Sequence, residues 1–285
     1  MAKAIVPPIS KLCNGVIRIL GMNPGVMTLQ GTNTYLLGNG KRRILIDAGE
    51  DGKLEYITNL KTVLQEENVS IEHIIITHWH QDHIGGVKDI LQHVGSDVSV
   101  WKFPRSCGKE QSGIPLKYLK DGDEFRVDDT ILRVFHTPGH TTDHVILFSP
   151  VSGHMFSGDN VLGEGTAVFE DLYEYMKSLN IMLKLNPMKI FPGHGPVVED
   201  PVSKLSYYIN HRNAREAQIL SVLHDNQEKK LSTMDIVKII YADVNENLHN
   251  AAAYNVSHHL EKLQKEGKVV SEDGDWMYQR LGSSL

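Results

Sequence analysis

The stretch His78-Trp79-His80-Gln81-Asp82-His83 places four potential metal ligands within six residues. It follows the short apolar run 73–77, which is typical of a strand buried on both faces of its sheet. Because side chains two residues apart project to the same side of an extended segment, His78 and His80 can bind one ion together. Asp82 and His83 lie at the turn into the next predicted helix, from where they can reach a second ion. The cluster therefore predicts a metal site.

Three further candidate ligands follow later β-type runs, and each has a glycine beside it. Glycine lets the backbone turn sharply and leaves the neighbouring ligand exposed. The whole set of five histidines and two aspartates suits Zn²⁺ best, with Mn²⁺ or Fe as alternatives. The three later ligands are His140 in His136-Thr137-Pro138-Gly139-His140, Asp159 in Phe156-Ser157-Gly158-Asp159 and His194 in Phe191-Pro192-Gly193-His194-Gly195.

The composition excludes several classes of protein. Hydrophobic residues make up 41% and charged residues 22% of the 285 residues, so the chain is neither disordered nor of low complexity. The net charge of −6 provides no general basic field for nucleic acid. No apolar run approaches the roughly 18 residues of a membrane span. The two cysteines, Cys13 and Cys107, are too few for a disulfide scaffold and fit a reducing compartment.

Two parts of the chain differ in their sequence pattern. Up to about residue 200, short β-type runs alternate with helical patterns, as in a layered α/β domain. From Pro201 the order is helix, helix, helix and β-hairpin, which is the order of a winged-helix module. We predict two domains, residues 1–210 and 211–285. The predicted strands cover residues 16–21, 34–37, 43–46, 73–77, 98–102, 124–127, 131–135, 144–148, 154–156 and 189–191, with helices over 53–68, 84–93, 168–185, 202–223, 233–241 and 251–265 and a hairpin over 267–278.

The motifs, taken together and in this order, resemble those of the metallo-β-lactamase fold hydrolases. The matching pieces are His-x-His-x-Asp-His, a lone histidine after Thr-Pro-Gly, Ser-Gly-Asp and Gly-His, which span residues 78–194. The resemblance implies a four-layer αββα sandwich, of the mixed α/β and α+β type, followed here by the small winged-helix-like domain. It also implies one metal site from His78, His80 and His140, a second from Asp82, His83 and His194, a bridging Asp159, and Asp47 bracing the metal loop.

Further motifs resemble one branch of that family, the mitochondrial endoribonucleases of animals that act on single-stranded RNA. This resemblance covers nearly the whole chain, and it alone implies RNA as the substrate and the mitochondrial matrix as the location, with the cytoplasm as the alternative. Basic residues without an acidic one before Asp47 would fit a presequence, whereas Pro7-Pro8 favours a folded N-terminus. The motifs are Gly31-Thr32-Asn33-Thr34-Tyr35, Thr77-His78-Trp79-His80, Leu162-Gly163-Glu164-Gly165-Thr166, Phe169-Glu170-Asp171-Leu172-Tyr173 and His211-Arg212-Asn213 with Arg215-Glu216.

The expected chemistry follows from two Zn²⁺ ions per chain. Two ions about 3.5–4 Å apart can share a hydroxide at neutral pH, which would attack the phosphorus of an RNA phosphodiester in line. We expect Asp82 both to bind a metal and to orient the nucleophile. His211 is the one candidate for protonating the leaving group. The chain between Asp159 and His194 is too short for a further domain, so the groove is expected to be open and to favour unpaired strands.

Two other functions remain as alternatives. A thioester hydrolase of the glyoxalase II type has nearly the same metal motif, although it ends in a helical segment instead of a winged helix. A catalytically inactive scaffold that binds RNA or protein is the other alternative, although none of the seven ligands is missing. The hairpin tip Glu272-Asp273-Gly274-Asp275 is acidic and would repel phosphates, so we expect no DNA binding by this module and favour packing or a homodimer.

Overall fold

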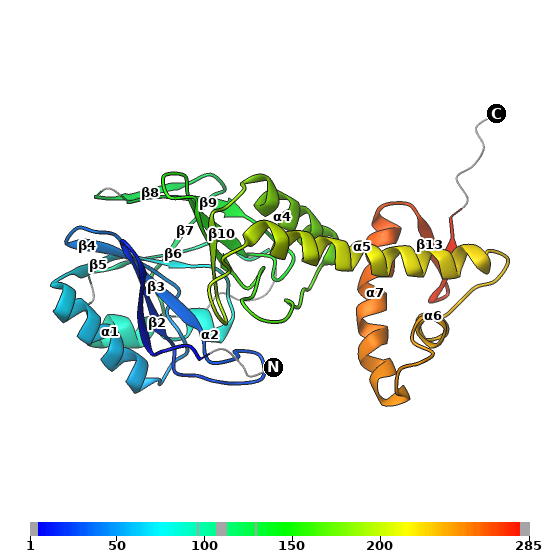
Figure 1. Cartoon of the computed structure of the whole chain (residues 1–285), viewed down its shortest axis with the longest axis horizontal. Coiled ribbons are helices and arrows are strands. Elements are labelled where there is room, and N and C mark those ends of the chain that lie inside the picture. Colours follow the sequence, from blue (N-terminus) through cyan, green and yellow to red (C-terminus); the bar gives the residue numbers. More distant parts are fainter. Residues whose placement is uncertain (1–4, 96, 107–112, 129, 280–285) are drawn as a thin grey trace.

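Two β-sheets packed face to face lie at the centre of the larger part of the molecule (Figure 1). The computed structural model describes residues 5–95, 97–106, 113–128 and 130–279, and Cys107 lies outside these ranges. The first sheet has its strands in chain order: β1 (Ile9–Cys13), β2 (Val16–Leu20), β3 (Asn33–Leu37), β4 (Arg42–Ile46), β5 (Ser70–Ile76), β6 (Ser99–Lys102) and β7 (Leu116–Tyr118). The second has the order β12 (Lys189–Pro192), β11 (His154–Gly158), β10 (Val145–Ser149), β9 (Thr130–His136) and β8 (Glu124–Val127).

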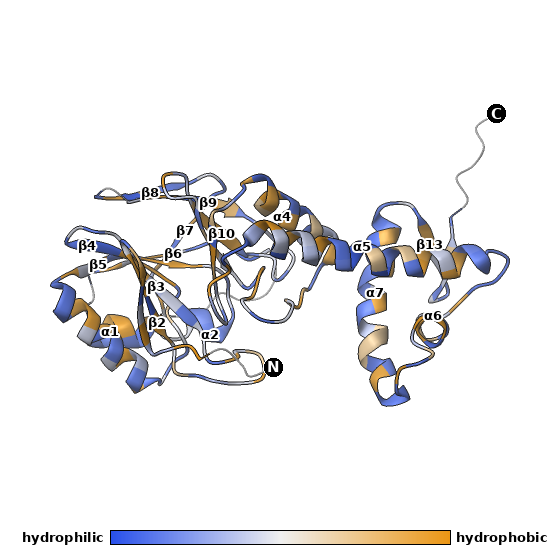
Figure 2. Cartoon of the chain, viewed as in Figure 1, coloured by the Kyte–Doolittle hydropathy of each residue, from blue (hydrophilic) through white to orange (hydrophobic). Residues whose placement is uncertain are grey.

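Helices cover the outer face of each sheet. The helices α1 (Leu54–Glu67), α2 (Gln81–Ile84) and α3 (Val87–His93) pack on the first sheet. Helix α4 (Leu172–Lys184) and the first part of α5 (Pro201–Asp225) pack on the second. Figure 2 shows hydrophobic and hydrophilic residues on each of α1, α4 and α5, as expected for helices that bury one face and expose the other. The predicted four-layer αββα sandwich is confirmed.

Strand β5 illustrates how the sequence produces these layers. Its residues Ile74, Ile75 and Ile76 are all fully buried, as predicted for a strand covered on both faces. Ile74 and Ile76 pack beneath the helices of the first layer, whereas Ile75 faces the second sheet. Successive side chains of a strand point to opposite faces, so an unbroken apolar run is what a central strand of a four-layer sandwich requires.

One edge of the sandwich collects the polar residues that follow its strands. His78 follows β5 and Asp47 follows its parallel neighbour β4. Asp159 and His194 follow the parallel pair β11 and β12 in the other sheet. Because the ends of parallel neighbours meet at the same edge, these residues come together although they are far apart in the sequence.

The end of the chain forms a small second unit with its own core. Figure 1 shows it at the far end of α5, with α6 (Thr233–Ile240), the 3₁₀ turn η1 (Glu246–Leu248), α7 (His249–Lys265) and the hairpin of β13 (Val269–Glu272) and β14 (Asp275–Tyr278). Ser232 and Asp235 form a capping box at the start of α6. Asp273 and Gly274 both have positive φ at the hairpin turn, as a tight turn between twisted strands requires. This arrangement confirms the predicted winged-helix module.

Helix α5 belongs to both units. Leu205 and Tyr208 pack into the core beside the second sheet, whereas Ile219 and Leu223 pack into the core of the C-terminal unit. The predicted division between residues 210 and 211 therefore falls inside a continuous helix. The two units are joined by a helix that has hydrophobic contacts in each.

Side chains of α7 add direct contacts between the units. Lys265 pairs with Asp171, the residue that caps α4, at 2.6 Å. Within α5 and α7, the ammonium of Lys262 lies 2.6 Å from the carboxylate of Glu216, and both side chains are buried. A buried charge of either sign is costly without its partner. These ion pairs therefore hold α7 in one position against α4 and α5.

The sequence prediction differs from the structure at a few elements. Strands β1 and β7 were not predicted, and the helix predicted over 168–185 begins only after Asp171, whose carboxylate accepts hydrogen bonds from the next helical amides. The helix predicted over 84–93 is instead two helices, with Gly85 and Gly86 between them. Gly86 lies so close to Ala48 that a Cβ there would be 2.1 Å from the Ala48 carbonyl oxygen. Among the described residues, no helix combines the length and the apolar character that crossing a bilayer requires.

Replacing Lys262 with alanine should destabilise the chain by about 2 kcal/mol, because Glu216 would stay buried with Lys268, 3.2 Å away, as its remaining partner. Urea unfolding at neutral pH measures the change. Lys177→Ala is the matched control, because Lys177 pairs with Glu174 at 3.0 Å on an exposed face of α4, where an ion pair contributes about 0.5 kcal/mol. Equal losses in the two variants would contradict the structural role of the buried pair.

The stability of the chain should also depend on the protonation of His259 in α7, which is 2% exposed. Burial, together with the charges of Arg212, Lys262 and Arg215, lowers the pKa of His259 from 6.5 to about 3. The unfolded chain therefore binds a proton at this residue between those two pH values while the folded chain does not, so stability falls as the pH drops below about 6.5. In His259→Phe, unfolding measured from pH 7 to pH 4 should show a shallower loss of stability than in the wild type.

Candidate metal centre

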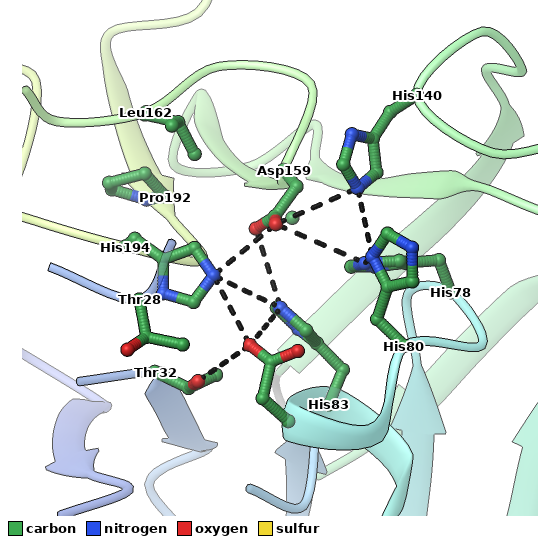
Figure 3. Close-up of polar contacts among 12 residues, drawn as sticks. Thr28, Thr32, His78, His80, His83, His140, Asp159, Leu162, Pro192 and His194 are labelled. Atoms are coloured by element: carbon green, nitrogen blue, oxygen red, sulfur yellow. Dashed lines mark hydrogen bonds and ion pairs between the residues drawn. The ribbon is translucent and has the colours of Figure 1, made fainter. Parts of the chain in front are cut away.

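Three imidazoles and a carboxylate converge to form the first half of the candidate site (Figure 3). His78 Nε2 lies 2.9 Å from His80 Nδ1, which in turn lies 3.2 Å from His140 Nε2. The nearest ligand atoms of these three histidines and of Asp159 all lie within 4.8 Å of one another. Lone pairs that face each other at such distances in a buried place fit a single tetrahedral cation.

The second half lies beside it and contains Asp82, His83 and His194. Asp82 Oδ2 is 3.2 Å from His83 Nε2 and 3.3 Å from His194 Nε2. The two histidine nitrogens are themselves 3.4 Å apart. His83 and His194 are buried, whereas Asp82 is partly exposed toward the pocket described below.

Asp159 lies between the two groups, as Figure 3 shows. Its Oδ2 is 3.2 Å from His194 Nε2 and 3.7 Å from His140 Nε2, so it reaches ligands of both halves. Its Oδ1 is 3.4 Å from His83 Nε2 and is buried without a hydrogen bond. A carboxylate in this position, with an oxygen that lacks a hydrogen bond, fits the role of a bridge between two cations. The residues present therefore fit a two-metal centre.

Two short backbone features position the ligands. Helix α2 has a single turn, which presents Asp82 and His83 next to each other immediately after His80. Residue 193 must be glycine, because a Cβ there would lie 2.3 Å from Asp159 Oδ1 and 2.9 Å from the ring of His83. The Gly-His pattern seen in the sequence thus reflects the close approach of the β12 end to the bridging carboxylate.

Hydrogen bonds hold the nitrogens on the far sides of the His83 and His140 imidazoles. His83 Nδ1 lies 2.8 Å from Asp47 Oδ2, and the same aspartate accepts hydrogen bonds from the amide and the hydroxyl of Thr77. His140 Nδ1 donates to the carbonyl of Val168 at 2.8 Å. Such partners fix which nitrogen carries the proton and direct the other toward a metal. Asp47 therefore lies where the resemblance places a residue that braces the metal loop.

Thr32 and His144 also support the ligands, although their roles were not recognised in the sequence. The Thr32 hydroxyl donates to Asp82 Oδ2 at 2.8 Å. The backbone amide of Asp159 donates to His144 Nε2 at 3.1 Å, and the His144 ring lies against that of His78. His144 follows the His140 motif by four residues, and its place beyond a turn was the only signal available. Thr32 lies in the motif of residues 31–35, but nothing in that motif indicates its contact with Asp82.

The protonation states of the cluster suit cation binding. Burial lowers the pKa of His78, and burial with the charge of His140 lowers that of His80 to about 4, so both imidazoles are neutral at pH 7. Burial would raise the pKa of Asp82, but the charge of His83 and the hydrogen bond with His194 outweigh it and keep the carboxyl ionised. Burial likewise opposes the charge on His83, yet Asp82 and Asp159 raise its pKa well above the ordinary value. Without a cation, His83 in the second half therefore stays protonated at neutral pH.

His211 does not lie in this centre. It is exposed on α5, where its side chain contacts Arg212 and Tyr207. It is not among the residues that line the pocket over the metal ligands. Its predicted role as proton donor gains no support from this position.

A pocket of about 510 Å³ opens over the ligands Asp82, His140, Asp159 and His194. One wall is the loop of residues 26–29, in which Val26 and Met27 are largely exposed. Another is the segment 162–168, which α5 supports through hydrogen bonds from Tyr208 to Gly165 and from Arg212 to Ala167. Most of the lining is apolar, and the described residues that line it include no lysine or arginine.

Comparison with known proteins agrees with this architecture. Residues 27–194 match the metallo-beta-lactamase superfamily, and residues 232–276 match the beta-lactamase associated winged helix domain. The chain is 53% identical to "Beta-lactamase-like protein 2 homolog" of Drosophila melanogaster, over 95% of this chain and 96% of that protein. It is 46% identical to the protein of the same name from Caenorhabditis elegans, over 93% and 89% of the two chains.

A solved structure extends the likeness to the whole fold. A beta-lactamase domain protein from Burkholderia ambifaria matches with a TM-score of 0.76 at 19% sequence identity, covering 95% of this chain and 93% of that one. The chain therefore belongs to the metallo-β-lactamase superfamily, whose members are typically metal-dependent hydrolases. This confirms the family resemblance found in the motifs of residues 78–194.

Asp47→Ala should weaken binding of one of two Zn²⁺ ions about 10- to 100-fold, because His83 would lose the partner that orients its ring. Competition with a chromogenic chelator measures the affinity, and elemental analysis gives the number of ions per chain. Asp89→Ala is a suitable control, since its carboxylate accepts an exposed hydrogen bond from Gly52 away from the ligands. Unchanged zinc affinity in Asp47→Ala would contradict the bracing role.

Proposed function

We propose that this chain is a zinc-dependent endoribonuclease that hydrolyses phosphodiester bonds of single-stranded RNA in the mitochondrial matrix. The observation that carries the proposal is the pair of ligand groups joined by Asp159 at the base of an open pocket. Two divalent ions held there would supply Lewis acidity for the phosphoryl oxygens and lower the pKa of water. The nitrogen and oxygen donors favour Zn²⁺, with Mn²⁺ or Fe as alternatives.

The residues of the chain have separate tasks in this proposal. Asp82 is ionised, partly exposed to the pocket and held by Thr32, so its second oxygen can accept a hydrogen bond from a nucleophilic water and orient it. Asp159 holds the two halves of the centre at a fixed separation. The exposed loop of residues 26–29 and the segment 162–168 would contact the strand on either side of the scissile bond.

The open shape of the pocket supports an unpaired RNA strand as the substrate. A flexible strand can place its backbone and splayed bases against apolar walls, whereas a duplex presents a stiff and wide surface. The winged-helix unit is not proposed to bind DNA, because at its wing Lys230 is paired with Glu272 at 2.8 Å and lies 3.8 Å from Asp273. We propose instead that this unit serves packing, including in a homodimer.

One observation favours a second candidate, a thioester hydrolase of the glyoxalase II type. The apolar lining and the absence of lysine and arginine from its described residues suit an acyl chain better than a polyanion. In that case Asp82 and Asp159 would serve the same metal centre, and the substrate would be a neutral thioester group.

Incubation of the zinc-loaded chain with single-stranded RNA and, separately, with S-lactoylglutathione distinguishes the two candidates. We expect endonucleolytic cleavage of the RNA, slower cleavage of a perfect RNA duplex, and little thioester turnover. Turnover of the thioester alone would reject the nuclease. Binding of less than about one metal ion per chain, with no turnover of either substrate, would favour an inactive scaffold.

The double variant Asp82→Ala/His83→Ala should lose RNA cleavage by at least about a hundredfold, because it removes two of the ligands of the second half. Its far-ultraviolet circular dichroism should match that of the wild type. His224→Ala/Asp225→Ala is the matched control: it removes another neighbouring histidine and aspartate, 3.5 Å apart and exposed at the end of α5. Full activity in the first variant would exclude the second half from the reaction.

A further inference from the structure

The pocket over the ligands presents a problem for an RNA substrate. Its described lining residues include Asp82, Asp159 and Glu164 but no lysine or arginine. Cations in the metal centre would neutralise the scissile phosphate, yet single-stranded RNA carries a negative charge on every neighbouring phosphate as well. A nuclease built on this site therefore needs a fixed cation at the border of the pocket.

Arg105 lies at that border. Its guanidinium carbon is 4.1 Å from the centre of the Trp79 ring, and Trp79 is part of the pocket lining. The Trp79 ring contacts the His80 ring, with centroids 4.6 Å apart. The cation is thus separated from a metal ligand by a single aromatic side chain, whose position is fixed by the two ligands on either side of it in the sequence.

The backbone that leads to Arg105 is firmly anchored. The ring of Phe103, two residues earlier, stacks on His136 with centroids 4.0 Å apart and an angle of 7° between the planes. The ammonium of Lys102 donates to the Phe103 carbonyl and pairs with Asp143 at 2.8 Å, and both charged groups are fully buried. Arg105 therefore leaves the sandwich from a rigid point, which reduces the entropy lost when it binds a ligand.

The carbonyl of Val168 accepts the hydrogen bond from His140, and Glu170, two residues later, is close enough to Arg105 to be affected by its charge. Burial raises the pKa of the Glu170 carboxyl, whereas the charges of His140 and Arg105 lower it. The charges of His140 and Arg105 therefore both act on the Glu170 carboxyl.

We propose that Arg105, which lies over the Trp79 ring, binds the phosphate of an RNA nucleotide next to the scissile bond. The inference rests on the proposed nuclease function and specifies how that site selects a polyanion. Stacking uses the face of a guanidinium, and the N–H donors lie in its plane, where they match the oxygens of a phosphate. Trp79 would act as a positioning residue, and Arg105 would set the register of the strand.

The test measures binding of a phosphorothioate single-stranded oligouridylate, which resists hydrolysis, to the zinc-loaded full chain by fluorescence anisotropy at several salt concentrations. Arg105→Ala should raise Kd about five- to tenfold and reduce the slope of log K against log salt by about one. Arg105→Lys should give an intermediate Kd, because lysine keeps the charge but not the planar fork. In cleavage assays, the loss should appear in KM more than in kcat.

Two controls separate phosphate binding from a structural effect. Arg133→Ala removes another arginine that lies over an aromatic ring, Phe135, at 5.3 Å, and it should leave Kd within twofold of the wild type. A methylphosphonate oligouridylate has an uncharged backbone, so Arg105→Ala should not change its binding. An unchanged Kd and salt slope in Arg105→Ala, or an equal loss with the uncharged oligonucleotide, would overturn the proposal.

Failure of the Arg105 assignment can be distinguished from failure of the proposed nuclease function. If the wild type cleaves RNA and Arg105→Ala binds it equally well, the assignment of Arg105 is wrong and the proposed function stands. If the wild type neither binds nor cleaves RNA, both proposals are wrong. Loss of thioester turnover, but not of RNA binding, in Arg105→Ala would also reject the assignment.

Discussion

The rest of the structure depends on one constraint: seven ligand side chains must share a small buried space without repelling each other. The neutral imidazoles of His78 and His80 face one another in the first half, and an ionised Asp82 lies beside the charged His83 and His194 in the second. Burial makes each unsatisfied lone pair or charge costly, so the cluster is stable only with cations or retained protons. This arrangement is kept in place by hydrogen bonds with three outer side chains, Thr32, Asp47 and His144.

The sequence predicts the site best where residues that can bind a metal stand at a regular spacing after a predicted strand. The histidine cluster after a wholly apolar strand and the glycine beside each later ligand were sufficient to predict the seven residues that the structure brings together. Contacts between distant segments were not predictable in this way, because Thr32 and His144 reach the ligands only through the sheet pairing. β7 is only three residues long, so its pattern is too short to detect. Nothing in the sequence shows that His211, the predicted proton donor, lies outside the pocket.

The pocket combines two properties that favour different substrates. Its apolar walls, with Val26, Met27 and Val168 exposed, suit bases or acyl groups, whereas the metal centre suits any anionic or polarised group under attack. Discrimination between a nucleic acid and a neutral ester must therefore come from the border of the pocket and not from its base. In the function that we propose, the Arg105 guanidinium over the Trp79 ring provides this discrimination.

Helix α5 links the pocket to the C-terminal unit, since it supports the segment 162–168 and then continues into the winged-helix core. An α-helix turns by about 100° and advances about 1.5 Å per residue. One residue inserted in its middle would therefore swing the C-terminal unit around the helix axis and break the contact between Lys265 and Asp171. The number of residues in α5 therefore determines how the C-terminal unit is oriented relative to the pocket. During evolution, insertions or deletions of about three or four residues, close to a whole turn, should be tolerated better than those of one or two.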